Sequence, residues 1–184
     1  VSLNCRDMAF LATDLIELVP LDPDDETHVE VYRQSRNEPE MRATGSYGEC
    51  DTRSQTRERI NEGHSTENPS ALCAIRAEER VVGWAVTNLH DVRAHAAYVG
   101  YYVLPDYWGN GYASEAAQLL VVYAFDEFNA HRVEANVQAD NPASKRVLEK
   151  LGFQREGTKR DAYYKQGEYK DIWLWSLLAD EFEE

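Results

Sequence analysis

The sequence predicts an α+β fold built on a mixed β-sheet, and two observations carry this prediction. The expected elements follow one another as a strand, two helices, three strands, a helix, a strand, a helix and a final hairpin. The three consecutive strands are joined by polar turns, which is typical of antiparallel neighbours. A chain of 184 residues can bury one hydrophobic core, so we expect a single domain over residues 1–184, with residues 1–13 as a loose N-terminal extension.

The N-terminal third is predicted to hold one strand and two helices. Residues 15–19 form an apolar run that Pro20 ends, because proline has no N–H to give to a strand partner. Residues 22–25 read Asp-Pro-Asp-Asp, an acidic start that is typical of a helix N-terminus. This helix is expected to end at residues 37–39, and a second, polar helix is expected from Asp51 to about Gly63.

The middle of the chain is predicted to form three antiparallel strands. Residues 71–75, 81–86 and 97–104 are apolar and rich in β-branched or aromatic side chains. The polar residues 76–80 and 90–95 between them are predicted to be turns.

The C-terminal part is predicted to alternate helices and strands. A long helix is expected to end near Phe128, and residues 132–138 alternate apolar and polar side chains as a strand with one polar face does. A helix is expected over residues 141–151, with an Asn or Asp cap and Pro142 in its first turn. Residues 153–164 and 169–178 are expected to close the chain as a hairpin.

Composition excludes several classes of protein. The formal net charge of −14 disfavours nucleic acid and anionic membranes as partners, because both require a positive protein surface. No apolar run is long enough to span a membrane, and the three widely spaced cysteines indicate reduced thiols, so we expect a cytoplasmic protein. The histidines show no zinc-type spacing, and we expect no metal site. Dispersed acids with few lysines favour a halophilic source, with an ordinary acidic enzyme as the alternative.

A glycine-bearing loop stands between the third of the central strands and the long helix. Residues 105–116 read PDYWGNGYASEA, with Gly109 and Gly111 just before the helix. Such a loop leaves several backbone N–H groups pointing one way at a helix N-terminus, which makes a phosphate site. The spacing matches neither the dinucleotide fingerprint nor the Walker loop. Two glycines that only turn the chain remain the alternative explanation.

These residues also resemble a known family. Residues 105–116 are similar to motif A of the GNAT acetyltransferases, in the branch that includes the ribosomal-protein N-acetyltransferases. Residues 141–144 (NPAS) resemble that branch's Asn-x-x-Ser, and residues 147–153 resemble its segment ending in Leu-Gly-Phe. The resemblance runs from about Leu15 to Phe182. It implies a GNAT fold, with helices on both faces of a twisted sheet and splayed central strands, and an acetyl-CoA-dependent N-acetyltransferase.

The resemblance also implies where acetyl-CoA binds. Backbone N–H groups of residues 109–113 would hold the pyrophosphate, and the pantetheine arm would pair with the end of the central strand. Trp108 occupies the position where the more common form of the motif has Arg or Gln. The implied cofactor-binding residues are Val103, Leu104, Trp108, Gly109, Asn110, Gly111, Tyr112, Ala113, Asn141 and Ser144.

Three residues are candidates for catalysis. The resemblance implies that Ser144 assists the departing thiolate and that Asn141 orients the cofactor arm, although both also fit a helix cap and its first turn. Relatives carry glutamates where this chain has Tyr98 and Tyr163, so Glu134 is the remaining candidate base. A solvated or salt-bridged strand residue is the alternative for Glu134. An α-amine has a pKa of about 7.7–8, so its demand for a base is small.

The acceptor amine is left open by the sequence. The N-terminal amine of a protein is the first expectation, because the ribosomal-protein branch carries the resemblance. A small-molecule amine such as a polyamine, amino acid or aminoglycoside is the alternative, and the aromatic residues near the loop could line an amine channel. A non-catalytic module that binds acyl-CoA is the alternative of another class. A homodimer is common in the family, but no residue here indicates one.

Overall fold

The computed structural model describes residues 9–39, 50–64 and 68–182. Its sheet has eight strands in the order β1-β2-β3-β4-β5-β6-β8-β7. Every neighbouring pair is antiparallel except β5 and β6, which run parallel. The strands are β1 (Leu11–Ala12), β2 (Glu17–Pro20), β3 (Ser70–Ala77), β4 (Arg80–Asp91), β5 (Ala96–Val103), β6 (Arg132–Gln138), β7 (Gln154–Lys165) and β8 (Glu168–Leu178).

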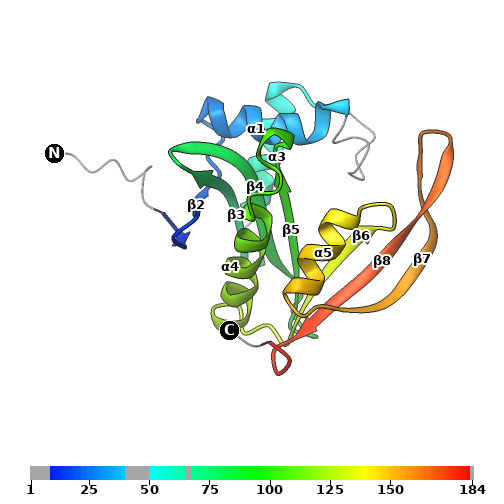
Figure 1. Cartoon of the computed structure of the whole chain (residues 1–184). Coiled ribbons are helices and arrows are strands. Elements are labelled where there is room, and N and C mark those ends of the chain that lie inside the picture. Colours follow the sequence, from blue (N-terminus) through cyan, green and yellow to red (C-terminus); the bar gives the residue numbers. More distant parts are fainter. Residues whose placement is uncertain (1–8, 40–49, 65–67, 183–184) are drawn as a thin grey trace.

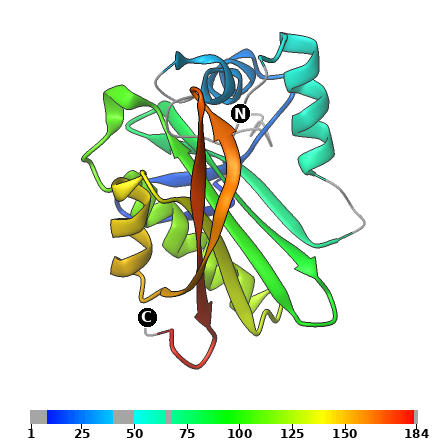
Figure 2. The ribbon, with the colours of Figure 1, turned by 90° about the vertical axis from the view of Figure 1, so that its right-hand side faces the viewer.

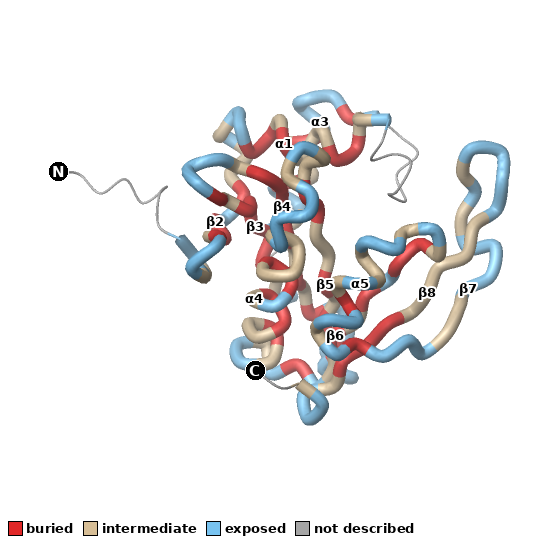
Figure 3. Tube along the Cα trace, viewed as in Figure 1, coloured by how far each residue is buried: buried red, intermediate tan, exposed pale blue. Residues whose placement is uncertain are grey.

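Helices cover both faces of this sheet (Figure 1). They are α1 (Glu26–Asn37), α3 (Arg53–Gly63), α4 (Tyr112–Asp126) and α5 (Pro142–Lys150), with a short 3₁₀ turn, η2 (Pro105–Tyr107). Successive strand side chains point to opposite faces, so β3 places Cys73 in the core under α4 and Ala74 in the core under α1 and α3. The buried residues follow the sheet and the helix surfaces that face it (Figure 3). The α+β fold with a mixed sheet is confirmed.

The two central strands part after a short pairing. β5 and β6 pair only from Ala96 with Arg132 to Tyr98 with Glu134. Beyond that point the ribbons diverge, and the second half of the sheet leans away from the first (Figure 1). The tip of the β7–β8 hairpin reaches the level of α1 and α3 in both views (Figures 1 and 2). The expected splay of the central strands is therefore confirmed.

Three expectations about element bounds are corrected. The segment expected to be a loose extension contributes β1, because Leu11 pairs with Leu18 of β2. β4 continues to Asp91 rather than ending at residue 86, since its polar residues still pair with β5. The central strand ends at Val103, one residue early, because the backbone turns into η2 after it. Residues 1–8 lie outside the described residues.

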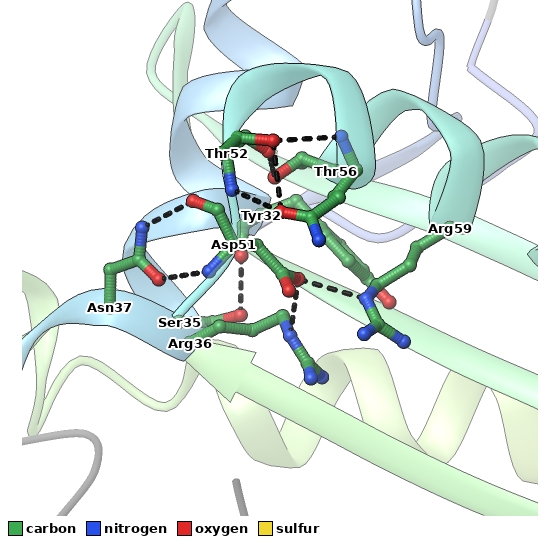
Figure 4. A network of polar contacts seen from close by, with 9 residues as sticks. Tyr32, Ser35, Arg36, Asn37, Asp51, Thr52, Thr56 and Arg59 are labelled. Carbon is green, nitrogen blue, oxygen red and sulfur yellow. Dashed lines mark hydrogen bonds and ion pairs between the residues drawn. The ribbon is translucent and has the colours of Figure 1, made fainter. Parts of the chain in front are cut away.

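A buried polar network ties α1 to the start of α3 (Figure 4). The Asn37 side chain donates to the Asp51 carbonyl and accepts from the Asp51 N–H, each at 2.8 Å. The Asp51 carboxylate, only 1% exposed, lies 2.5 Å from Arg36 Nε and 2.9 Å from Arg59 Nε. Thr52 then starts α3 with a capping box. The two helices therefore form one rigid wall on this face of the sheet.

Among the described residues, no helix combines the length and the apolar character that a membrane span requires.

Candidate active site

The glycine loop forms an open cradle at the N-terminus of α4. Gly109 and Gly111 have φ angles of +82° and +85°, a conformation that other residues adopt only with strain. Gly111 is the N-cap of α4, so the first N–H groups of the helix are left for another acceptor. A side chain at Gly109 would meet nothing within 4 Å, and one at Gly111 would reach only Leu15 at 3.7 Å. The open space and the free donors fit a pyrophosphate group.

Trp108 supports the strand end rather than replacing a phosphate-binding cation. Its indole Nε1 donates to the Val103 carbonyl at 2.7 Å, and the residue is 53% exposed. The Asn110 amide donates to the Tyr107 carbonyl at 3.0 Å, which fixes the loop from inside. Asn110 does not line the main cavity, unlike Trp108 and the two glycines.

Val103 presents its backbone to the gap between the diverging strands. The Leu104 N–H donates to Val82 of β4 at 2.9 Å, and the Leu104 carbonyl accepts from Tyr107, also at 2.9 Å. Because N–H groups alternate along a strand, those of Val103 and Tyr101 point away from β4, toward the side from which β6 has diverged. The Val103 N–H therefore faces this gap, whereas the Val103 carbonyl accepts from Trp108 Nε1. The backbone groups of Leu104 are engaged in the fold, so the expectation for Leu104 has no geometric support.

One cavity of about 830 Å³ connects the cradle to the opposite face of the sheet. Its cofactor half contains the glycine loop, the end of β5 and the start of α5. Its acceptor half is lined by side chains from α1, β4, β5 and β6. These are Ser35, Trp84, Tyr98, Tyr102 and Asn136. The sequence offered no signal for Ser35 or Asn136 at this site, because their proximity depends on how the elements pack.

Asn141 and Ser144 meet at the start of α5. Asn141 is the N-cap, and its Oδ1 accepts from the Ser144 N–H at 3.1 Å, so the capping role is real. The amide nitrogen of Asn141 and the hydroxyl of Ser144 are the groups that a ligand can engage, and both residues line the cavity. The Tyr101 hydroxyl approaches the Ser144 carbonyl at 3.4 Å, and burial raises the pKa of Tyr101, which keeps that hydroxyl neutral.

Glu134 lies apart from these residues, in a second cavity of about 430 Å³. Its carboxylate contacts Arg132 Nε at 2.9 Å and His90 Nε2 at 3.1 Å. The structure thus places Glu134 in an ion-paired cluster and not in the main cavity. Tyr163, at the other position where relatives carry a glutamate, donates to Asp140 at 3.4 Å. Its burial, together with the nearby Asp140 charge, raises the pKa of Tyr163 to about 12.

A single family model identifies this architecture. The acetyltransferase (GNAT) domain model matches residues 16–154, which is most of the chain. The chain therefore belongs to the GNAT acetyltransferase family, as its resemblance to motif A predicted.

Two curated relatives that match part of the chain are named as N-acetyltransferases. The uncharacterized N-acetyltransferase p20 of Bacillus licheniformis is 36% identical over 108 residues, which are 59% of this chain and 61% of that protein. The ribosomal protein uS5-alanine N-acetyltransferase of Escherichia coli is 29% identical over 106 residues, 57% of this chain and 55% of that protein. The matched region thus spans less than two thirds of the length of either relative.

A solved structure supports the fold. Spermidine N-acetyltransferase from Vibrio cholerae, in complex with CoA and spermine, has a TM-score of 0.81 at 17% identity, covering 92% of this chain and 98% of that chain. At this identity the likeness concerns the fold alone.

Proposed function

We propose that this protein transfers the acetyl group of acetyl-CoA to the N-terminal amine of a protein or peptide. The observation that carries the proposal is the single cavity that joins a phosphate cradle to an aromatic acceptor half across the splayed sheet. A cofactor entering from one face and an amine entering from the other can meet where β5 and β6 part.

Different residues of the cofactor half would bind the cofactor and assist the transfer. Backbone N–H groups of residues 109–113 would hold the pyrophosphate, and the Val103 backbone would pair with the pantetheine arm. An N–H at this strand end would stabilise the negative charge that develops on the carbonyl oxygen, worth about 3 kcal/mol for one donor. Ser144 would donate to the departing sulfur, and Asn141 would orient the arm. When bound, acetyl-CoA supplies the activated thioester.

The acceptor half favours an amine that also carries a carbonyl oxygen. Trp84 Nε1 and the Tyr102 hydroxyl are buried without a hydrogen-bond partner within the described ranges. Burial raises the pKa of Tyr102, so its hydroxyl stays available as a donor. A buried donor without a partner costs about 1–3 kcal/mol, which an acceptor oxygen would recover. A peptide N-terminus brings such oxygens, whereas a polyamine brings none.

Charge and aromatic rings near this half suit the ammonium form of the incoming amine. The ring centroids of Tyr32 and Trp84 lie 5.1 Å apart, and Trp84 and Tyr102 stack at 6.2 Å. Asp140 lines the cavity, and Glu38 at the end of α1 lies near enough to raise the pKa of Tyr102 further. Ring faces and carboxylates both attract cations. These features also suit a small cationic amine, which is therefore the second candidate.

Acceptor panels can separate the candidates. We would measure thiol release from acetyl-CoA with peptides of varied N-terminus, spermidine and free amino acids. The proposal expects peptides to be turned over with the highest kcat/KM. In Trp84→Phe, which keeps the ring and removes the N–H, kcat/KM for peptides should fall about tenfold while kcat/KM for spermidine stays within about twofold.

Two outcomes would redirect the assignment. A preference for spermidine that Trp84→Phe leaves unchanged would move the function to small-amine acetylation. Silence across the panel, with CoA still bound in calorimetry, would support a non-catalytic acyl-CoA-binding module.

The solution conditions of the assay follow from the charge. The net charge of −14 supports a protein adapted to a salt-rich cytoplasm. To test this, unfolding should be followed from low salt to molar KCl. A fold that is equally stable at both extremes would contradict the halophilic origin.

A further inference from the structure

The second cavity adjoins the main cavity. Tyr98 and Asn136 line both, so the two spaces share a wall at the point where β5 and β6 separate. The floor of the second cavity carries polar side chains from β4, β6 and β7, among them Asn88, His90, Glu134 and Lys159. It therefore offers a polar route from the acceptor half toward solvent.

His90 and Glu134 lie in contact in this cavity. His90 lies near the end of β4, and its Nε2 is 3.1 Å from Glu134 Oε2. The other carboxylate oxygen is held 2.9 Å from Arg132 Nε, and Arg132 also reaches Glu156 at 2.8 Å. Arg132 thus occupies one carboxylate oxygen of Glu134, and the other oxygen faces His90. A carboxylate fixed in this way holds the imidazole in one orientation, as in other histidine bases.

Tyr98 spans the distance between this pair and the acceptor half. It pairs with Glu134 across the two parallel strands, so its backbone lies beside the pair. Its ring folds over Gly100, where an added Cβ would lie 3.2 Å from Tyr98 Cε1 and 3.8 Å from the hydroxyl. The ring therefore runs along β5 toward the open end of the splay, and Tyr98 lines both cavities.

We propose that His90, oriented by Glu134, receives the proton that the acceptor ammonium loses before attack, through the passage lined by Tyr98 and Asn136. This inference rests on the proposed transfer to an amine and names the base that the sequence left open. The nitrogen then forms its bond to the acetyl carbon, the carbon–sulfur bond breaks, and the second amine proton ends on the sulfur. His90 releases the first proton to solvent, so the protons balance.

Charged groups around His90 come from each neighbouring element. Asp91 follows it on β4, and hydrogen bonds from the Ala94 and Arg93 N–H groups lower the pKa of Asp91, so that carboxylate stays ionised. Glu134 and Arg132 face it from β6, and Lys159 and Glu156 line the same cavity from β7. The charged groups around His90 are thus three carboxylates and two cations.

The pH dependence of kcat/KM tests the relay. In His90→Gln, kcat/KM at pH 7 should fall about 100-fold, the scale of one acid–base catalyst. The loss should shrink to less than about threefold at pH 9.5, where the amine has already lost its proton to water. In Glu134→Gln, kcat/KM at pH 7 should fall by about tenfold. CoA affinity, measured by calorimetry, and the melting temperature should stay unchanged in both variants.

His95→Asn is the matched control. His95 lies in the connection that follows β4, with a φ of +48°, which Asn tolerates, and it does not line the cavity. Its pH profile should match that of the unaltered protein. If His90→Gln leaves the pH profile unchanged, or lowers kcat/KM equally at pH 7 and 9.5, the relay is excluded. Failure of the unaltered protein to turn over any amine at pH 9.5 would instead count against the proposed function.

Discussion

The two halves of the main cavity are built in different ways. The cofactor half consists largely of backbone from one continuous stretch, in which Gly109 and Gly111 expose N–H groups just before α4. The acceptor half consists of side chains from α1, β4, β5 and β6, which meet only through packing. The cofactor half depends on backbone conformation. The acceptor half depends on the contacts that pack these distant elements together. Different substitutions should therefore damage each half.

The largest expected effect is a loss of stability when the ion pairs that join α1 to α3 are broken. Asp51→Asn removes the charge that Arg36 and Arg59 share in a nearly buried site. Loss of one partner of a buried ion pair costs about 3–5 kcal/mol, which urea unfolding would measure. The exposed Asp180→Asn should change the free energy of unfolding by less than about 0.5 kcal/mol. Equal stability of the two variants would show that the wall does not depend on this network.

The next effect concerns the chemistry of the cofactor half. Ser144→Ala should lower kcat by about 10–100-fold, because a thiolate with an ordinary pKa near 8.5 leaves with modest help. CoA affinity should change little, since α5 keeps its Asn141 cap. Ser144→Thr, which keeps a hydroxyl, should recover most of the rate. Stopped-flow or steady-state kinetics would show this, and an unaltered kcat in Ser144→Ala would assign the sulfur proton to another donor.

A backbone substitution should weaken the cradle without unfolding the protein. Gly111→Ala forces a Cβ onto a residue with φ of +85°, which costs about 1–2 kcal/mol, so CoA affinity should fall about tenfold. Gly157→Ala is the control, since Gly157 has open space and no positive φ. Calorimetric titration with CoA would compare them, and equal affinities would mean that the loop geometry does not set binding.

The smallest effect is expected for Asn141, where one substitution can separate helix capping from orientation of the cofactor arm. Asn141→Ser keeps an oxygen that caps α5 but removes the amide N–H groups. Thermal stability should be unchanged, while kcat/KM falls a fewfold through weaker positioning of the cofactor. Asn141→Ala should lose about 1 kcal/mol of stability as well. If Asn141→Ser behaves like the unaltered protein in kinetics, Asn141 is a capping residue only.

The same division explains how much the sequence could predict. The glycine loop, the Asn141 cap and Ser144 are local signals, because spacing along one segment fixes their geometry. The strand ends were less predictable: the strand predicted over residues 81–86 stopped at Val86, yet β4 continues through Thr87 and Asn88 because β5 pairs alongside.

Contacts between distant segments left no local signal. The position of His90 beside Glu134, which are 44 residues apart, depends on β4, β5 and β6 lying in that order. The same is true of the unpartnered Trp84 and Tyr102 donors, whose burial depends on α1 packing over the sheet. The hydrogen bond from the Leu104 N–H to Val82 is of the same kind, because only the fold brings these two residues together.

The paired bonds between Asn37 and Asp51 close a loop of chain on the acceptor side. Ser35, two residues before Asn37, lines the acceptor half of the cavity. Because these two bonds join the end of α1 to the start of α3, a shift of α3 would also displace Ser35. A substitution on α3 could therefore alter the choice of acceptor without touching the cavity itself.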